Sequence, residues 1–358
     1  MKKVLFVTNL PVPYKVDFFN LLSEKVKLTV LFERKTAKNR NSQWLSSKTI
    51  KFNHIFLKGI YIGVESSLSM QIIKLINKNR YDAIIIGAYY TPTALLAILY
   101  MKMRNIPYYI STDGGFKKDD KFLHKKVKTF FLKNAKGYFS PNSISDEYLV
   151  YYGASEKKII RYPFTSLLSE DIISNTIANE SKEHYKRIIG FKKKYLVLGV
   201  GQIIPRKGWD LLIKSAEFLS DDVGIIIIGG KNDIKLSLPK NVEILDFVDK
   251  STLEKYYLAA DIFVLPTRED IWGLVINEAM GKGLPVITTD RCGAGLELVK
   301  DGGNGYIIKH DDYTSLQDSI TLLLENEDLR NRYSIESLKR IKNYTLEHMA
   351  EVFYQNIN

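Results

Sequence analysis

The sequence lacks several features, and each absence excludes a class of protein. A single cysteine, Cys292, excludes a disulfide within the chain, and the five histidines are scattered without the spacing of metal ligands. The longest apolar run, around Ile225–Ile228, is far shorter than the ~18–20 residues that a membrane-spanning helix needs. No glycine precedes Gly59, and no glycine-rich loop ends in Gly-Lys-Ser/Thr. We therefore expect no structural metal, no P-loop and no glycine-rich pyrophosphate site in the first βα turn.

The composition is that of an ordinary globular protein, with 45% apolar and 26% charged residues. The 358 residues predict two domains, because one domain usually holds ~100–200. The net charge of +12 and a pI near 9.3 favour polyanionic partners: nucleic acid, an anionic membrane surface or phosphorylated substrates. Two lysines precede an apolar run at the start, but Asn9, Pro11 and Pro13 interrupt it. This pattern predicts a first strand rather than a secretion signal, and hence a cytoplasmic protein.

Short β-branched runs alternate with helix-compatible segments, as is typical of parallel βαβ units. The predicted strands are Val4–Thr8, Leu28–Phe32, Ala83–Gly87, Tyr108–Ser111, Tyr138–Ser140, Tyr195–Val200, Gly224–Ile228, Val242–Leu245, Ile262–Leu265 and Pro285–Thr288. The rhythm breaks near 162–180, where we place a linker. The pattern predicts two Rossmann-like, doubly wound α/β domains facing a cleft, over 1–165 and 166–340. Helix is predicted over Leu329–Ile357, with 341–358 packing on the N-terminal domain.

The segment with the strongest functional signal follows the strand that ends at Leu265. A polar loop containing Asp270 leads to a helix that is predicted to begin at Gly273 and to carry Glu278. The free amides at such a helix end, together with the helix dipole, attract anions. Two carboxylates, Asp270 and Glu278, can face one hydroxyl-rich ligand. For an isolated pair of this kind, a capped helix with a solvated glutamate is the commoner explanation. The rest of the segment favours a binding site instead.

The segment resembles the Glu-x7-Glu region of family 4 retaining glycosyltransferases, which have the GT-B fold. The resemblance covers the C-terminal half, in Gly199-Val-Gly201, Lys207-Gly208, Thr289-Asp290, Gly293-Ala294-Gly295 and the stretch 301–306. The N-terminal half matches mainly in rhythm, and in Pro141-Asn142-Ser143 and Tyr162-Pro163-Phe164. The resemblance implies that Glu278 contacts the donor ribose, that Asp270 contacts the sugar in place of the usual glutamate, and that the amides of Gly273, Leu274 and Val275 receive the diphosphate.

The phosphate-binding residues depart from the family pattern, which reads Gly-Arg and, five residues later, Lys-Gly. This chain has Gly201-Gln202 and then Arg206-Lys207-Gly208. Cations are needed there because negative charge grows on the departing diphosphate. Lys207 fits this role directly, and Arg206 is predicted to compensate for the missing arginine. A solvated turn is the alternative. The position of the pair between a Gly-x-Gly strand end and a helix near Trp209 favours a phosphate site, so both interpretations stay open.

Two further segments carry weaker signals. Phe247 and Val248 follow a strand, and the resemblance places the nucleotide base against this backbone; a strand-end turn with core side chains is the alternative. Asp113 lies in Ser111-Thr112-Asp113-Gly114-Gly115, directly after a strand. It occupies the place of a histidine loop in similar enzymes, where it would touch sugar or acceptor hydroxyls. A simple Asx-type turn is equally consistent with its sequence.

The segment Phe116–Lys136 has eight lysines interleaved with four phenylalanines. On a helix it predicts an amphipathic basic surface suited to an anionic membrane, which would place the protein on the inner face of the cell membrane and favour a lipid-linked acceptor. A solvated helix whose aromatic residues pack into the core is the alternative. No nucleic-acid recognition motif accompanies the positive charge, so no nucleic acid is expected.

The function predicted from these features is transfer of a hexose-type sugar from a nucleoside diphosphate, such as a UDP-sugar, to a hydroxyl acceptor. The resemblance implies retention of configuration and a glycan or lipid-linked acceptor of a capsule, lipopolysaccharide or other surface polysaccharide. No Asp-x-Asp motif occurs, so no cofactor and no divalent metal are expected. Two alternatives stay open: a sugar-nucleotide epimerase or hydrolase of the same fold, and a non-catalytic partner subunit, which the departures at Gln202 and Asp270 make conceivable.

Overall fold

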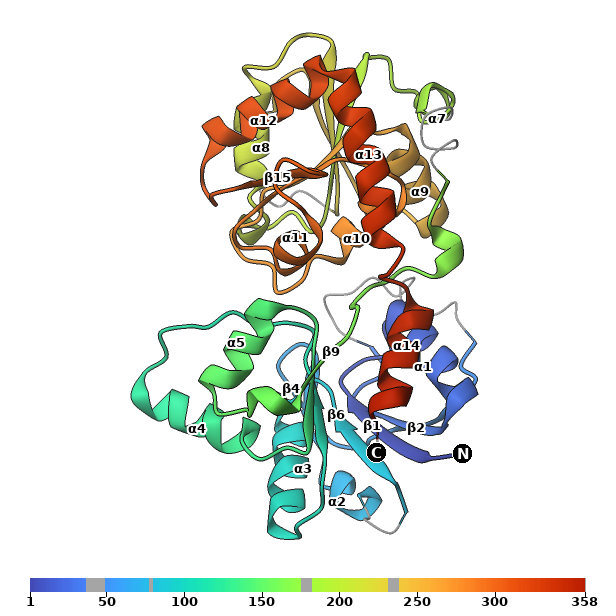
Figure 1. The fold of residues 1–358 in the computed structure, drawn as a ribbon, viewed down its shortest axis with the longest axis vertical. Helices are drawn as coiled ribbons and strands as arrows, with labels where there is room; N and C mark the ends of the chain where they lie inside the picture. Colours follow the sequence, from blue (N-terminus) through green and yellow to red (C-terminus); the bar gives the residue numbers. More distant parts are fainter. Residues whose placement is uncertain (37–48, 77–79, 175–181, 231–237, 358) are drawn as a thin grey trace. The chain divides into compact units, whose positions relative to one another are not determined.

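The computed structural model describes residues 1–36, 49–76, 80–174, 182–230 and 238–357 (Figure 1). The chain divides into two compact units. Unit 1 consists of Met1–Thr165 together with Leu346–Asn358, and unit 2 of Ser166–Thr345. Residues 175–180 of the predicted linker lie outside the described residues. Within the described part of the chain, no helix combines the length and the apolar character needed to cross a membrane.

Unit 1 is built on a parallel sheet of seven strands in the order β3-β2-β1-β6-β7-β8-β9. The strands are β1 Lys3–Thr8, β2 Lys27–Phe32, β3 Asn53–Phe56, β6 Ala83–Ile86, β7 Tyr109–Ser111, β8 Gly137–Ser140 and β9 Ile159–Arg161. A separate antiparallel hairpin joins β4 (Ile60–Ile62) and β5 (Ser66–Leu68). The helices are α1 Pro13–Lys25, α2 Gln71–Leu75, α3 Pro92–Met103, α4 Phe122–Leu132, α5 Ser143–Tyr151 and α14 Leu346–Asn356. The five strands predicted in this half are confirmed to within one residue at either end.

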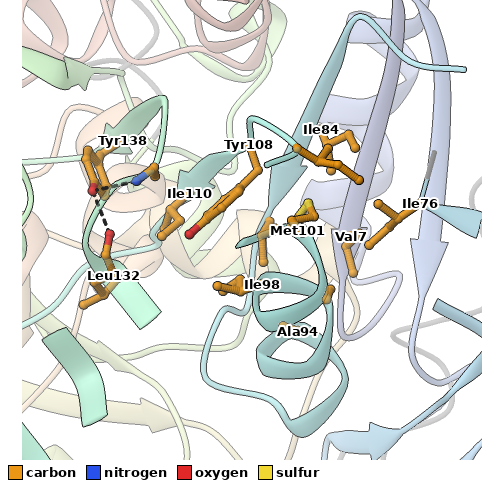
Figure 2. Packing of buried hydrophobic residues seen from close by; sticks show 14 of the residues in the cluster. Val7, Ile76, Ile84, Ala94, Ile98, Met101, Tyr108, Ile110, Leu132 and Tyr138 are labelled. Atoms are coloured by element: carbon orange, nitrogen blue, oxygen red, sulfur yellow. Dashed lines mark hydrogen bonds between the residues drawn. The ribbon is translucent and has the colours of Figure 1, made fainter. Parts of the chain in front are cut away.

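The core of unit 1 forms where α3 covers the sheet (Figure 2). Ile98 and Met101 of α3 are fully buried against Val7 of β1 and Ile84 of β6. The β-branched residues of the strands are buried because helices cover both faces of a parallel sheet. Tyr138 brings a hydroxyl group into this core, and the group is satisfied because it donates to the carbonyl of Leu132 at 2.6 Å and accepts from the amide of Ala135 at 3.2 Å.

The C-terminal helix α14 belongs to unit 1, together with Met1–Thr165. Phe353 on α14 stacks on Phe139 of β8 with ring centroids 3.9 Å apart. The segment predicted as helical contains two helices, because α13 (Glu327–Ile341) ends in unit 2 and α14 begins at Leu346. Unit 2 therefore extends to Thr345 rather than to residue 340.

Unit 2 has a parallel sheet of six strands in the order β12-β11-β10-β13-β14-β15. The strands are β10 Tyr195–Val200, β11 Val223–Ile228, β12 Val242–Leu245, β13 Ile262–Leu265, β14 Val286–Thr289 and β15 Gly305–Ile308. The helices besides α13 are α7 Lys182–Ile188, α8 Trp209–Ala216, α9 Lys250–Ala259, α10 Leu274–Gly281, α11 Gly293–Leu298 and α12 Tyr313–Glu325. The five predicted strands are again confirmed to within one residue, whereas β15 was not predicted.

Local signals in the sequence explain where several helices begin. Thr91 accepts a hydrogen bond from the amide of Ala94 and is followed by Pro92, so α3 starts with a side-chain cap and a proline in its first turn. Asp249 caps α9 in the same way, by accepting from two amides of its first turn. Such caps satisfy amides that have no partner within the helix.

Each sheet reverses its strand order at one point, between β1 and β6 in unit 1 and between β10 and β13 in unit 2. In open α/β sheets, ligands bind at the carboxyl ends of the strands that flank such a point. In unit 2 the segments that follow β10 and β13 are the two that the sequence marked as functional, and the fold places them side by side.

Candidate active site

The segment after β10 begins at Gly201, which has a φ of +149°. A Cβ atom at this position would lie 3.3 Å from the ring of Trp209 and 3.5 Å from Cε of Lys207. A glycine therefore lets the Lys207 side chain pass close to the strand end. Trp209 secures the other end of the segment, since its indole N–H donates to the carbonyl of Gln202 at 2.9 Å.

Lys207 and Asp270 form a close ion pair at the carboxyl ends of β10 and β13. The Nζ of Lys207 lies 2.5 Å from Oδ2 of Asp270, and the two side chains are only 12% and 14% exposed. Arg206 is more exposed, and its Nη1 lies 3.8 Å from Oδ1 of Asp270 and donates to the carbonyl of Glu269. The structure thus brings together three of the four predicted catalytic residues.

Helix α10 begins beside this ion pair. Its N-cap residue, Gly273, has a φ of +101°, and a Cβ atom there would lie 2.9 Å from Sγ of Cys292 and 3.5 Å from Oδ2 of Asp270. Only glycine fits this conformation and this space. The amides of the first turn, which include those of Leu274 and Val275, therefore start next to the carboxylate of Asp270. The predicted start of the helix is confirmed.

Cys292 is buried beneath the start of α10 and is not a nucleophile. Its thiol donates to the carbonyl of Trp272 at 3.1 Å, and burial raises its pKa to about 12. The thiol is therefore protonated at neutral pH, whereas a reactive cysteine is a thiolate.

Glu278 lies on α10 and is held by two hydroxyl groups. Ser166 donates to Oε1 at 3.0 Å and Tyr257 donates to Oε2 at 3.1 Å. Burial raises the pKa of Glu278 above its usual range, and the two hydrogen bonds oppose this shift. Both carboxylate oxygens keep further lone pairs, so the group can accept hydrogen bonds from a vicinal diol such as a ribose.

Phe247 and Val248 follow β12, the edge strand of this sheet. Phe247 is 36% exposed, and its amide donates to Oδ1 of Asp246 at 2.7 Å. The two residues share the carboxyl edge of the sheet with Lys207, and β11 separates their strand from β10. Contact with a nucleotide base stays a prediction for both.

Asp113 lies in unit 1, after β7. Its Oδ2 is 3.3 Å from Nζ of Lys15 and 3.4 Å from the hydroxyl group of Tyr14. A small cavity at the reversal point of this sheet is lined by Asp113, Lys15, Thr8 at the end of β1 and Gly87 after β6. Tyr14 and Lys15 were not singled out from the sequence, because nothing in the β1–α1 segment marks them as partners of a residue about 100 positions later.

The basic segment forms α4, and its side chains are mostly exposed. Phe122 is 73% and Phe130 50% exposed, while Phe131 packs against the hydrophobic core. The alternative in which the aromatic residues pack into the core is therefore wrong for Phe122 and Phe130. Among the described residues, no group of three or more His, Cys, Asp or Glu side chains could hold a metal ion.

Comparison with known proteins gives this arrangement a context. Residues 181–340 match the family model of glycosyl transferases group 1. The chain is 24% identical over 254 residues to the N,N'-diacetylbacillosaminyl-diphospho-undecaprenol alpha-1,3-N-acetylgalactosaminyltransferase of Campylobacter jejuni, which covers 65% of each chain. It is 28% identical over 175 residues to the capsular polysaccharide biosynthesis glycosyltransferase CapM of Staphylococcus aureus, covering 46% of this chain and 45% of that one. The matches span less than two thirds of either relative.

Two solved structures resemble the whole chain. HepE from Anabaena in complex with UDP superposes with a TM-score of 0.76 at 16% identity and covers 99% of both chains. A glycosyltransferase from Rickettsia africae superposes with a TM-score of 0.77 at 16% identity, covering 99% of this chain and 98% of that one. At this identity the likeness shows the fold. The chain has the GT-B fold, and residues 181–340, which lie in unit 2, are similar to the group 1 glycosyl transferases.

Proposed function

We propose that this protein transfers a hexose-type sugar from a nucleoside-diphosphate sugar to a hydroxyl acceptor. The observation that carries the proposal is the position of Lys207 and Asp270 against the start of α10, at the point where the strand order of unit 2 reverses. A helix N-terminus with an adjacent ammonium group attracts a diphosphate, and a carboxylate beside it accepts hydrogen bonds from sugar hydroxyls.

Each residue has a distinct role in the proposal. The diphosphate lies at the amides of Leu274 and Val275, where Lys207 and Arg206 balance its charge. Glu278 accepts hydrogen bonds from the ribose, and Asp270 contacts the sugar. In the free protein Lys207 is paired with Asp270, so donor binding shifts the ammonium group from the carboxylate toward the phosphate.

The chemical step that we propose retains the configuration of the sugar. The bond between the anomeric carbon and the diphosphate oxygen breaks, and that oxygen takes the proton of the acceptor hydroxyl group on the same face. The acceptor oxygen then bonds to the anomeric carbon. Negative charge grows on the leaving phosphate, where Lys207, Arg206 and the α10 amides stabilise it. We expect the reaction to need no divalent metal, so that turnover is unchanged by chelation with EDTA.

The acceptor that we propose is a glycan or a lipid-linked glycan of a surface polysaccharide. The names of the relatives support this class, since one acts on a diphospho-undecaprenol substrate and the other in capsular polysaccharide biosynthesis. Asp113 is the residue that we propose for acceptor hydroxyls. The exposed face of α4 would bring the protein to an anionic membrane surface on the cytoplasmic side.

A thermal-shift screen against UDP-, GDP-, ADP- and CMP-sugars tests the donor class. A ligand at ~100 times its Kd stabilises the folded protein by about 2.7 kcal/mol, which raises the melting temperature measurably. UDP-sugars come first, because the structural neighbour HepE was solved with UDP. Incubation of the selected donor with and without lipid-linked acceptors then separates transfer from donor hydrolysis or epimerisation. Turnover of the donor without any acceptor, at the full rate, would contradict the proposal.

A further inference from the structure

We infer that Arg268 is a positioning residue that fixes the phosphate-facing turn Pro205–Lys207 relative to Asp270. This inference rests on the proposed function, since it concerns the same diphosphate site. Arg268 lies between β13 and Asp270 in the chain, two residues before that carboxylate. It was not singled out from the sequence.

The side chain of Arg268 joins three segments at the carboxyl edge of the sheet. Its Nη1 and Nη2 donate to the two carboxylate oxygens of Asp210, in the first turn of α8, at 2.8 and 2.6 Å. Its Nε donates to Oδ1 of Asp311, after β15, at 2.6 Å. Asp311 has a φ of +63°, a conformation that a residue other than glycine rarely adopts. The planar guanidinium group can satisfy both carboxylates at once, whereas an ammonium group cannot reproduce this geometry.

Arg268 and its neighbour also hold the turn itself. Nη1 of Arg268 donates to the carbonyl of Pro205 at 2.7 Å, and its backbone amide donates to the carbonyl of Arg206 at 2.8 Å. The hydroxyl group of Thr267 donates to the same Arg206 carbonyl at 2.9 Å. Two consecutive carbonyls of the turn are therefore bonded to Thr267 and Arg268, which lie three and two residues before Asp270. This arrangement determines where Lys207 lies relative to Asp270 and to the start of α10.

Arg268 is distinct from the phosphate-binding residues. All three of its guanidinium nitrogens donate to Asp210, Asp311 or Pro205, so its charge is balanced by two carboxylates rather than offered to a ligand. Its effect on the donor must therefore pass through Lys207. Loss of the Arg268 side chain removes the bond to the Pro205 carbonyl and the links to Asp210 and Asp311, while the two bonds to the Arg206 carbonyl remain. The turn is then held less firmly, and Lys207 spends less time at the position that meets the distal phosphate.

Titration calorimetry with UDP and UMP tests this inference, because the ratio of their affinities reports the contribution of the distal phosphate. We expect Arg268→Ala, Arg268→Lys and Asp210→Asn to lower the preference for UDP over UMP by about tenfold, while the affinity for UMP stays nearly unchanged. Arg268→Lys keeps the positive charge, and Asp210→Asn keeps the volume of the side chain. These two conservative variants therefore test the inference even if Arg268→Ala does not fold. Arg340→Lys is the matched control, since Arg340 also donates to backbone carbonyls, those of Leu298 and Glu297, but contacts no part of the turn.

A double-mutant cycle with Lys207→Ala separates positioning from general stability. If Arg268 acts through Lys207, Arg268→Ala has no further effect on the preference for UDP once Lys207 is replaced. Additive losses in the double variant, or a single variant that keeps the wild-type preference, would overturn the inference and leave the proposed function intact. A wild-type protein that binds UDP no better than UMP would instead count against the nucleotide site itself.

Discussion

The ion pair between Lys207 and Asp270 shows how two residues 63 positions apart form one site. Both were predicted from the sequence, each from its own local motif. Their contact with each other was not predicted, because it depends on β10 and β13 being neighbours in the sheet. In the free protein Lys207, the cation that we propose for the phosphate, is paired with a carboxylate, and this pairing avoids an unpaired charge in a largely buried site.

Replacement of Lys207 by alanine should lower kcat for sugar transfer about 10²–10³-fold, which corresponds to about 2–4 kcal/mol of transition-state stabilisation. The reason is that negative charge on the leaving phosphate is greatest when the glycosidic bond breaks. Initial rates with the donor identified by the screen measure the effect. Lys214→Ala is the control, because Lys214 lies on α8 over the ring of Tyr313. Equal rates for the wild-type protein and Lys207→Ala would remove Lys207 from the mechanism.

Glu278 gives a prediction about stability and pH. Because burial raises its pKa, the folded protein binds this proton more tightly than the unfolded chain does. Stability from this group is therefore complete below the ordinary pKa of 4.5 and falls as the pH rises toward the raised value. Glu278→Gln has no titrating group at this position and does not lose this stability. The melting temperature of the variant should therefore rise relative to that of the wild-type protein as the pH increases from 4 to 8.

Thermal unfolding in steps of half a pH unit measures this difference. Glu297→Gln is the control, since Glu297 lies in the same unit and also accepts a hydrogen bond from a tyrosine, Tyr344. The prediction would be contradicted if the difference in melting temperature between Glu278→Gln and the wild-type protein did not change with pH. Glu278 would then bind its proton equally tightly in the folded and the unfolded chain. The donor of the hydrogen bond to Oε2, Tyr257, could not be found from the sequence, because a tyrosine in a tyrosine-rich helix carries no signal of its partner.

At the scale of elements, most of the strands that the sequence predicted are buried on both faces; the edge strand β12 is the exception. These strands read as continuous apolar runs, whereas β3 (Asn53–Phe56) includes a polar pair and β9 (Ile159–Arg161) has three residues at the sheet edge. Edge strands need fewer apolar residues, so their sequences resemble loops. The start of α10 was predictable for a different reason, since Gly273 is the residue that its backbone conformation requires.

The exposed face of α4 gives a prediction at this scale. Phe122→Ser and Phe130→Ser should each weaken binding to vesicles that contain phosphatidylglycerol. Both rings are exposed in the protein, and each would contribute to binding by inserting into the membrane, in addition to the attraction between the lysines and the anionic lipid. Co-sedimentation at low and high salt measures both contributions. Phe218→Ser is the control, as Phe218 is 58% exposed in unit 2. Equal sedimentation of the wild-type protein with neutral and anionic vesicles would contradict a role for the lysines.

At the scale of the whole molecule, the chain leaves unit 1 at Thr165 and returns to it at Leu346. The returning helix completes an aromatic cluster in which Phe353 contacts Phe6, Phe18, Phe139 and Tyr162. The sequence predicted that residues 341–358 pack on the N-terminal domain. The aromatic partners of Phe353 could not be predicted, because they lie on β1, α1, β8 and the segment after β9.

Phe353→Ala should destabilise unit 1 by about 3–5 kcal/mol, since it removes a fully buried ring and leaves a cavity. Urea unfolding followed by far-UV circular dichroism should show an earlier transition for unit 1, while that of unit 2 is unchanged. Tyr354→Ala is the control, because Tyr354 is the neighbouring aromatic residue and is 39% exposed. An unchanged transition for Phe353→Ala would mean that the helix contributes little to unit 1.

The return of α14 to unit 1 also sets an order for synthesis. The side chain of Lys2 donates to the carbonyl of Ile357 at 2.6 Å, so the segment just before β1 is bonded to the end of α14, 355 positions later. A nascent chain that has left the ribosome as far as Thr345 contains all of unit 2, yet the sheet of unit 1 still lacks Phe353, which stacks on Phe139 of β8. Unit 2 can therefore fold before α14 is synthesised, whereas unit 1, whose strands are made earlier, stays incomplete until α14 follows.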